Sequence, residues 1–354
     1  MLDTEHTMKT PGLLNYRMPG EWEPHVGTWL TWPRSDGISF PDKYDVVPPV
    51  FAKLIRHLAE VEQVFLNVWD SEMEESVRRI LTREKVPVAH VSFHHFPAYE
   101  PWCRDHGPIF LTRDTARGHQ RVIINWKYNA WGDKYPPYDL DNEIPVHVAK
   151  LRDLPLFSPD MVLEGGSIEV NGLGTLLTTE ACLLNPNRNP DLSRSEIEQM
   201  LRDYLGVSKI IWLGEGVAGD DTDGHIDTLA RFIDPTTIVA AVEEDIQDAN
   251  YHFLNENYHR LRMARDQDDH LFRIVKLPMP GMVEFQGQRL PATYVNFYIA
   301  NGIVIVPLFN HRNDARALEI LQENFPDRKV IGIDSRDLIW GLGSFHCLTQ
   351  QEPV

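Results

Sequence analysis

The chain has 354 residues, of which 42% are hydrophobic and 24% charged, a composition typical of a globular protein with one large core or two. Its 34 Lys and Arg residues against 52 Asp and Glu residues give a net charge of −18, which argues against nucleic acid or an anionic membrane as partner. No run approaches the roughly 18 uncharged apolar residues of a membrane span, and the acidic surplus is compatible with a small cationic substrate.

The first predicted helix–strand pair lies in residues 51–68. Its helix is indicated by apolar residues at helical spacing, namely Phe51, Leu54, Ile55 and Leu58. A β-type run at residues 64–68 follows directly. The pattern therefore predicts a helix that leads into a buried strand.

The second pair, residues 192–214, has the clearest helix signals. Ser193 and Glu196 form a capping box, and Gly206 stands where a C-terminal cap is expected. One helix face is apolar and consists of Ile197, Met200, Leu201, Tyr204 and Leu205. The run KIIWLG then predicts a buried strand, and residues 313–334 repeat the helix-then-strand plan.

The return of this unit without any Gly/Ser or Pro linker indicates one domain that spans residues 1–354. Alternating helices and strands favour an α/β fold built from several similar modules. The sequences of the modules differ too much for the repeats to be aligned by eye.

Four polar, glycine-containing stretches follow or end apolar, strand-like runs. They are WCRDHGP (102–108), LEGGS (163–167), GDDTDGHID (219–227) and GSFHC (343–347). Loops at strand ends commonly carry functional groups in α/β proteins, because the strands hold them rigidly. We therefore expect the reactive side chains to come from these four stretches.

Cys347 is the candidate nucleophile, and it needs a lowered thiol pKa or a nearby base. Its neighbour His346 is a poor base if GSFHCLTQ is an extended strand, because consecutive side chains then point to opposite faces. His225, in the third polar stretch, is the better candidate.

Four carboxylates surround His225 in the sequence: Asp220, Asp221, Asp223 and Asp227. Such a cluster cannot be buried without a cation, because like charges raise one another's pKa. The cation is either a metal ion or a positively charged substrate. The separate roles of Asp220, Asp221 and Asp223 stay open at this point.

The metal hypothesis rests on Asp223-x-His225-x-Asp227, which matches the way ureohydrolases hold manganese. Such sites need a second aspartate-rich motif, and the chain offers only the single carboxylates Asp105 and Glu164. The alternative cation is a guanidinium, which is planar, always charged and suited to paired carboxylates. A thiol, two aspartates and a histidine beside a glutamate would serve to displace ammonia from it.

Taken together, the motifs resemble the agmatine deiminase family, within the guanidine-modifying (pentein) superfamily that includes arginine and peptidylarginine deiminases. The resemblance runs nearly end to end through the segments 21–33, RDHGP, 164–190, DDTDGHID, 293–307 and HCLTQQEP. The long block EGGSIEVNGLGTLLTTEACLLNPNRNP and the terminal HCLTQQ are its most specific parts.

The resemblance implies a five-bladed α/β propeller with pseudo-fivefold symmetry and an active site in its central channel. It also implies roles for five residues: Asp105 and Asp227 grip the guanidinium, Glu164 is the partner of His225, and Cys347 is the nucleophile. Trp102 matches an aromatic residue near the bound guanidine, where it would stack on the cation.

The implied reaction is the hydrolysis of agmatine to N-carbamoylputrescine and ammonia through a covalent adduct on Cys347, with neither metal nor organic cofactor. Other guanidines, such as free arginine or peptidyl-arginine, are alternative substrates. A manganese-dependent ureohydrolase and a non-catalytic guanidine-binding protein are the alternatives from other classes.

Some segments depart from the family pattern, and they affect the recognition of the substrate's tail. Tyr99-Glu100 replaces a short Asn-Asp or Asp-Asp element, the segment after NAWG is shortened, and the usual glycine run reads Gly341-Leu342-Gly343-Ser344. Glu100 is the predicted substrate-binding residue at the amine end, with Asp139 as its alternative.

The sequence also predicts the protein's cellular setting. The N-terminus lacks a basic segment followed by an apolar one, so no secretion signal is expected. Three scattered cysteines do not make a disulfide framework, and a cytoplasmic location is expected. The expected partner is a small cationic guanidine, while the oligomeric state is left open.

Overall fold

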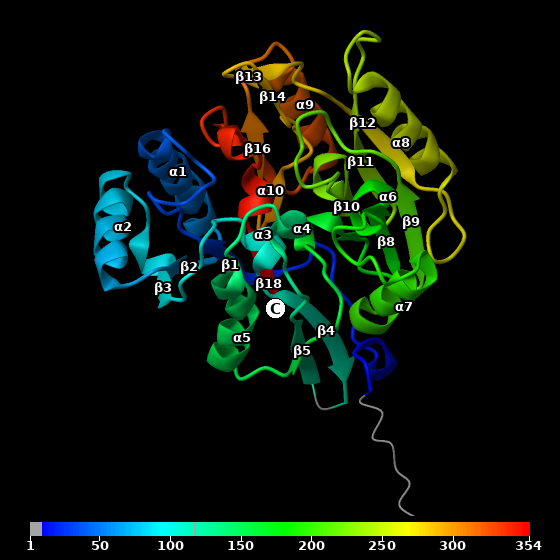
Figure 1. Cartoon of the computed structure of the whole chain (residues 1–354), viewed down its shortest axis with the longest axis horizontal. Helices are drawn as coiled ribbons and strands as arrows, with labels where there is room; N and C mark the ends of the chain where they lie inside the picture. Colours follow the sequence, from blue (N-terminus) through cyan, green and yellow to red (C-terminus); the bar gives the residue numbers. More distant parts are fainter. Residues whose placement is uncertain (1–8, 117) are drawn as a thin grey trace, which may run out of the picture.

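The computed structural model describes residues 9–116 and 118–354, which form five sheets of three or four strands and one two-stranded hairpin (Figure 1). Four sheets follow one another along the chain: β4–β5–β6 (Ile109–Thr115, Gly118–Ile124, Leu156–Phe157), β7–β8–β9 (Glu169–Val170, Thr175–Thr179, Lys209–Leu213), β10–β11–β12 (Ala230–Asp234, Thr237–Val242, Arg273–Pro278) and β15–β16–β17 (Tyr298–Ala300, Ile303–Leu308, Lys329–Asp334). The hairpin is β13–β14 (Val283–Phe285, Gln288–Leu290).

The fifth sheet joins the two ends of the chain. Its strand order is β18–β1–β2–β3 (Gln350–Pro353, His25–Thr31, Gln63–Val68, Val91–His95). Glu352 fastens the last strand, because its carboxylate accepts hydrogen bonds from Trp29, Arg121 and Arg152. The C-terminal strand is therefore an integral part of the sheet.

All five sheets share one pairing pattern. The first two strands are antiparallel, and the second and third are parallel. A parallel pair needs a crossover connection, and helices supply it in every sheet: α1 (Val47–Ala59), α4 and α5 (Ala130–Asp133, Asp139–Arg152), α6 and α7 (Glu180–Leu183, Arg194–Leu205), α8 (Tyr251–Met263) and α9 (Asp314–Asn324). Helix α2 (Ser71–Arg83) adds a second crossover, to β3. The predicted α/β fold of similar modules is confirmed.

The predicted local signals form as expected. Helix α7 begins with the capping box of Ser193 and Glu196 and ends at Gly206, which adopts a left-handed conformation at φ 68°. It buries Ile197, Leu201 and Leu205, and β9 follows it. The other two predicted pairs are α1 with β2 and α9 with β17.

One local prediction is wrong. Residues 345–348 do not extend as a strand but form the single helical turn α10 (Phe345–Leu348), and the last strand begins only at Gln350. The turn is closed by the backbone bond from Leu348 N to Ser344 O and by the Thr349 hydroxyl, which donates to Phe345 O. These local hydrogen bonds outweigh the strand propensity of the run.

Short segments just before the first strand of each sheet lie together in the middle of the molecule. They are α3 (Cys103–His106) before β4, η4 (Gly165–Ser167) before β7, η5 (Ile226–Thr228) before β10, Asn296 before β15, and α10 before β18. Figure 1 shows α3 and α10 near the centre, whereas α2, α5, α7 and α8 lie at the periphery. The shared pattern thus delivers one polar segment from every sheet to the same region.

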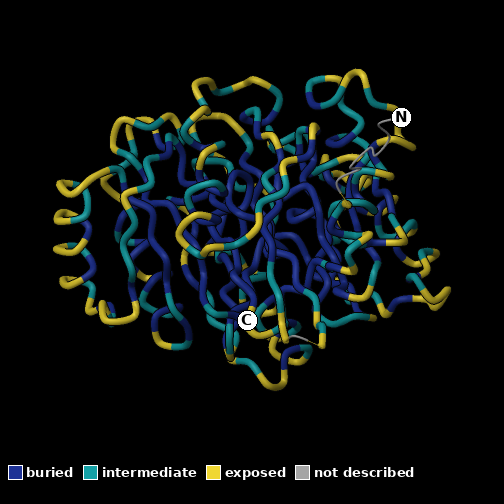
Figure 2. The backbone as a smooth tube through the Cα atoms, turned by 90° about the horizontal axis from the view of Figure 1, so that it is seen from below, coloured by how far each residue is buried: buried dark blue, intermediate teal, exposed yellow. Residues whose placement is uncertain are grey.

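Burial follows this arrangement. Figure 2 shows buried backbone through the middle of the molecule and exposed positions along its outer turns and helices. Among the largest fully buried side chains are Trp29, Tyr294 and Tyr298. Within the described part of the chain, no helix has the length and apolar character needed to cross a membrane.

Candidate active site

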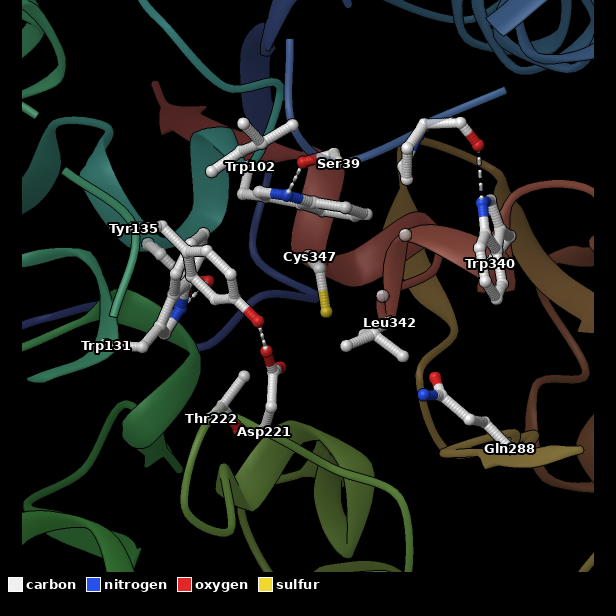
Figure 3. Close-up of a pocket in the computed structure, with 15 residues that line it drawn as sticks. Ser39, Trp102, Trp131, Tyr135, Asp221, Thr222, Gln288, Trp340, Leu342 and Cys347 are labelled. Carbon is white, nitrogen blue, oxygen red and sulfur yellow. Dashed lines mark hydrogen bonds between the residues drawn. The ribbon is translucent and has the colours of Figure 1, made fainter. Parts of the chain in front are cut away.

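Cys347 faces a cavity of about 200 Å³ that opens near the centre of the molecule (Figure 3). Its walls combine aromatic and polar residues: Ile38, Ser39, Pro41, Trp102, Asp105, Trp131, Tyr135, Asp221, Thr222, Gln288, Trp340, Gly341, Leu342 and Gly343. Of the sequence-predicted site residues, Cys347, Asp105 and Trp102 line this cavity directly. A concave, mostly apolar space with a few convergent polar groups is the usual form of a small-molecule site.

The thiol of Cys347 is held between an amide and a carboxylate. Asn296 Nδ2 lies 3.2 Å from Sγ, and Asp227 Oδ2 lies 3.5 Å from it. Burial, followed by the charges of Asp227 and Asp105, raises the pKa of Cys347 well above its ordinary value. Without a cation beside it, the thiol is therefore protonated at neutral pH.

His346 does not face the thiol beside it. Its Nδ1 lies 2.8 Å from Asp227 Oδ2, and its Nε2 lies 2.9 Å from Glu21 Oε2. Both ring nitrogens of His346 therefore face carboxylates, and neither is directed at the thiol. The expectation that His346 is not the base agrees with this geometry, although a helical turn rather than an extended strand produces it. His346 instead fixes Asp227.

Asp227 and Asp105 are buried close together but have different environments. Burial would raise the pKa of Asp227, but His346 outweighs it and lowers that pKa. Asp105 accepts hydrogen bonds from Gly166 N at 3.0 Å and Trp131 Nε1 at 3.1 Å. Burial, with Asp227 and Glu164 nearby, nevertheless raises the pKa of Asp105 to about 6. Of the two carboxyls, Asp105 is therefore the one whose charge an additional cation would stabilise.

His225 lies between two carboxylates. Its Nδ1 is 3.5 Å from Asp105 Oδ1, and its Nε2 is 4.0 Å from Glu164 Oε2. Burial alone would lower the pKa of His225, but Asp105, the Cys182 thiol and Glu164 raise it well above its ordinary value. His225 is therefore protonated in the empty site and able to give up a proton.

Several buried polar atoms of these residues have no hydrogen-bond partner in the structure. They are Asp227 Oδ1, Glu164 Oε2, His225 Nδ1 and His225 Nε2. Buried polar groups are nearly always paired, so a group of unpaired ones marks a place where a ligand supplies the missing partners. These atoms belong to three of the five residues to which the resemblance assigns roles.

The predicted manganese arrangement does not form. Asp223 turns away from His225 and accepts hydrogen bonds from Arg188, Asn187 and Lys134. Asp227 Oδ2 is taken by His346. Among the described residues, the potential metal-binding group consists of Glu164, Cys182 and His225, with ligand atoms within 4.8 Å of one another. Asp223 and Asp227 do not belong to it, so the positions of these side chains do not support the D-x-H-x-D hypothesis.

The two residues expected at the amine end lie elsewhere. Glu100 is buried behind the cavity wall, where it accepts hydrogen bonds from Ile38 N and from the Ser39 hydroxyl. Ser39 in turn accepts a bond from Trp102 Nε1 at 2.8 Å, so Glu100 positions the wall instead of lining it. Asp139 is hydrogen-bonded to the Tyr99 hydroxyl outside the cavity. Glu100 lies in a loop and Asp139 at the first position of α5, and the sequence pattern does not define the direction of either side chain.

Three residues of the site were not predicted from the sequence. Asn296 contacts Sγ, Asp221 lines the cavity with its carboxylate bonded to the Tyr135 hydroxyl, and Trp131 donates to Asp105. Trp131 lies in a left-handed turn of residues 130–133, which all have positive φ. The Gly in NAWGD was a signal for an unusual turn, whereas Asn296 sits in an otherwise apolar run that predicts only strand.

The comparisons with known proteins agree with this geometry. An agmatine deiminase of Enterococcus faecalis has a solved structure that superposes with a TM-score of 0.91 at 33% identity and covers 99% of each chain. A substrate-bound agmatine deiminase of C. jejuni gives 0.85 at 31% identity, over 95% of this chain and 96% of that one. A curated relative from Legionella pneumophila (strain Paris), provisionally named an agmatine deiminase, is 36% identical over 97% of both chains.

These similarities confirm the predicted resemblance to agmatine deiminases. Residues 17–353 match the family model of the Porphyromonas-type peptidyl-arginine deiminases. The match spans nearly the whole chain and includes every segment that contributes to the cavity around Cys347. The chain therefore belongs to the Porphyromonas-type peptidyl-arginine deiminase family.

Proposed function

We propose that this protein hydrolyses the guanidinium group of agmatine to give N-carbamoylputrescine and ammonia, through a covalent intermediate on Cys347. The observation that carries the proposal is a thiol facing a cavity beside a group of buried, unpaired carboxylate and imidazole atoms. A guanidinium supplies the positive charge and the N–H donors that this group lacks. The similarity to agmatine deiminases over almost the full chain supports the same substrate.

Binding begins with the two buried aspartates. The guanidinium donates hydrogen bonds to Asp227 Oδ1, which has no other partner, and to Asp105. Trp102 and Trp131 line the same cavity, where their aromatic rings can form cation–π contacts with the planar guanidinium. Two carboxylates in fixed positions orient the central carbon toward Sγ, which is the main requirement for attack.

The substrate then activates its own nucleophile. The charges of Asp105 and Asp227 raise the thiol pKa of Cys347, and the bound cation neutralises them. Asn296 Nδ2, 3.2 Å from Sγ, stabilises the thiolate once it forms. Cys347 therefore loses its proton to solvent when the cation binds, and a thiolate is not exposed to other electrophiles beforehand.

His225 moves the protons. The Cys347 thiolate forms a C–S bond to the guanidinium carbon, and protonated His225 transfers its proton to the departing nitrogen, which leaves as ammonia. The neutral His225 next takes a proton from water, whose oxygen attacks the same carbon. The C–S bond then breaks, the departing thiolate takes up the remaining hydroxyl proton, and the neutral substituted urea is released. Glu164, held by Arg188 at 2.6 Å, stabilises the imidazolium.

The outer part of the cavity fits an amine better than a carboxylate. Asp221 provides a carboxylate there, and among the described lining residues none is a lysine or an arginine. Free arginine would bring its α-carboxylate toward the carboxylate of Asp221, and the repulsion between like charges opposes binding. An alkyl chain that ends in an ammonium finds apolar walls and a counter-charge instead.

Asp221→Asn is expected to raise the KM for agmatine about tenfold, because the variant loses a charge-assisted hydrogen bond to the tail ammonium. Steady-state ammonia release measures the effect. Butylguanidine, which has the same chain length without the amine, is the control substrate, and its KM stays at the wild-type value. An equal loss with both substrates would contradict a role for Asp221 in tail recognition.

The KM for agmatine is expected to rise as the pH falls below about 6. The pKa of Asp105 in the empty site is raised to about 6, so this carboxyl is ionised above that pH and protonated below it. A protonated Asp105 no longer attracts the cation, and KM increases roughly tenfold per pH unit in this range. A KM that stays constant between pH 7 and pH 5 would contradict the assignment.

The proposal extends to the arrangement of the five sheets and to the extent of the domain. The five sheets are the blades of a five-bladed α/β propeller with the active site in its central channel, and residues 1–354 make up one catalytic domain. The common strand pairing and the five polar segments near the centre support this arrangement.

The reaction uses no metal or organic cofactor, because side chains supply every proton transfer. Three free cysteines support a cytoplasmic location.

Product analysis tests the proposal. The protein is incubated with agmatine, free arginine or a peptidyl-arginine, and ammonia and urea are measured with and without EDTA. Ammonia from agmatine at an equal rate in EDTA is the expected result. Urea as the product, with loss of activity in EDTA, would instead indicate a ureohydrolase. Agmatine binding without any product would indicate a non-catalytic guanidine-binding protein.

A further inference from the structure

Leu342 has a backbone conformation that leucine rarely adopts. Its φ is 67° and its ψ is 10°, in the left-handed region that favours glycine. A β-carbon in this region lies too close to the backbone, so the conformation is unfavourable for leucine. A strained residue persists only where its surroundings hold it, and such residues often occur at functional sites.

The surroundings of Leu342 are two glycines pressed against the cavity wall. A β-carbon on Gly343 would come within 2.5 Å of the Trp102 ring, and one on Gly341 within 2.8 Å of it and 2.5 Å of Phe40. Neither position therefore accommodates a side chain without displacing an aromatic ring. The loop lies flat on Trp102, and only its central residue carries a side chain.

That side chain lines the cavity next to the nucleophile. Figure 3 shows Leu342 close to Sγ of Cys347, with Asp221 and Tyr135 on the other side of the space below the thiol. The loop is fixed from behind as well, because Trp340 Nε1 donates to Pro41 O at 3.1 Å and the Trp340 ring packs on Phe285 at 4.3 Å. Leu342 has little freedom to move away from an entering ligand.

We infer that Leu342 is a specificity-determining residue that restricts the cavity to guanidines whose tail is unbranched beside the guanidinium. The inference rests on the proposed function and deepens it. With the guanidinium held by Asp105 and Asp227 below Sγ, the first tail carbon passes between Leu342 and Tyr135 on its way to Asp221. A methyl branch on that carbon would meet the Leu342 side chain. Glycine would form the same turn without strain, but it would leave this space open.

The test compares two variants on two substrates. Leu342→Gly and Leu342→Ala both remove most of the wall, and kcat/KM is measured for agmatine and for agmatine with one methyl group on the carbon beside the guanidinium. The preference is the ratio of kcat/KM for agmatine to kcat/KM for the methylated substrate. This ratio is expected to fall at least tenfold in both variants, because a tight pocket discriminates against one additional methyl group by about this factor or more. A preference that changes less than threefold in both would overturn the inference.

Thermal unfolding of the same variants tests the strain. Both lose the leucine side chain, but only Leu342→Gly relieves the left-handed backbone, so it is expected to melt at a higher temperature than Leu342→Ala. The reverse order would show that the backbone is not strained at this position. The two possible failures can be told apart. If the proposed function is wrong, the wild-type protein releases no ammonia from agmatine; if only the inference about Leu342 is wrong, it does release ammonia.

The chain contains a matched control. Residues 172–174 repeat the sequence Gly-Leu-Gly, but Leu173 is 60% exposed, has no positive φ and lies outside the cavity. Leu173→Gly is expected to keep the wild-type substrate preference, and it gains no stability over Leu173→Ala. A shift of preference in this variant equal to that of Leu342→Gly would overturn the inference.

Discussion

Cys347→Ser is expected to reduce ammonia release by at least about three orders of magnitude, the usual result of removing a covalent nucleophile. A serine hydroxyl ionises far less readily than a thiol, and in this site the neighbouring charges of Asp227 and Asp105 oppose ionisation further. The substitution changes one atom at a position packed in α10, so the fold is retained. Agmatine binding, measured by calorimetry, is expected to persist because the aspartates are untouched.

The same experiment distinguishes covalent catalysis from alternatives. A variant that retains more than about a tenth of the wild-type rate would contradict attack by Cys347.

In the wild-type protein, acid quenching during turnover followed by mass spectrometry is expected to find the substrate-derived adduct on the peptide that contains Cys347. Iodoacetamide provides a further check, because the raised thiol pKa predicts slow alkylation at neutral pH and faster alkylation as the pH rises.

Asp227→Asn is expected to abolish turnover and to destabilise the protein as well. The variant loses one side of the guanidinium clamp, and it also breaks the buried ion pair with His346 at 2.8 Å. Removing one partner of a buried pair typically costs about 3–5 kcal/mol. The sign follows from the lowered pKa of Asp227: its ionised form stabilises the folded state at neutral pH, and this contribution is lost as the pH falls.

Asp105→Asn is the matched comparison for Asp227→Asn. Its carboxylate has no cationic partner in the empty site apart from His225, and its raised pKa shows that burial disfavours the charge. The variant therefore loses activity to a similar extent, but its stability loss is smaller and stems from mispairing with the Gly166 and Trp131 donors. Urea unfolding and ammonia release measure the two effects. Equal destabilisation by both substitutions would contradict the role of His346 in fixing Asp227.

Much of the local structure follows from sequence signals of short range. Capping, apolar spacing and a terminal glycine predict α7 because each acts within a few residues, and the helix forms with those boundaries. The reactive residues stand out for a similar reason. Cys347, His225, Glu164, Asp105 and Asp227 are chemically distinctive groups in glycine-rich stretches, and their combination resembles a single family.

The tail end of the site could not be predicted in the same way. Glu100 and Asp221 are both acidic residues in loops, but a difference in loop direction places Glu100 behind Ser39 and Asp221 inside the cavity. Asn296 is hidden in an apolar run, where the sequence pattern indicates burial and says nothing of a contact with sulfur. His346 was set aside as a base, and its partners Asp227 and Glu21 lie 119 and 325 residues away in sequence.

The α/β class and the repeated helix-and-strand plan follow from local propensities, and the five residues proposed for guanidine chemistry stand out in the sequence because their side chains are chemically distinctive. Three features are visible only in the folded chain: Cys347 lies on a helical turn, Asp223 pairs with Arg188, and Leu342 lines the cavity. Each of these depends on hydrogen bonds and packing between segments from different sheets, and such long-range contacts leave no periodic trace in a single sequence.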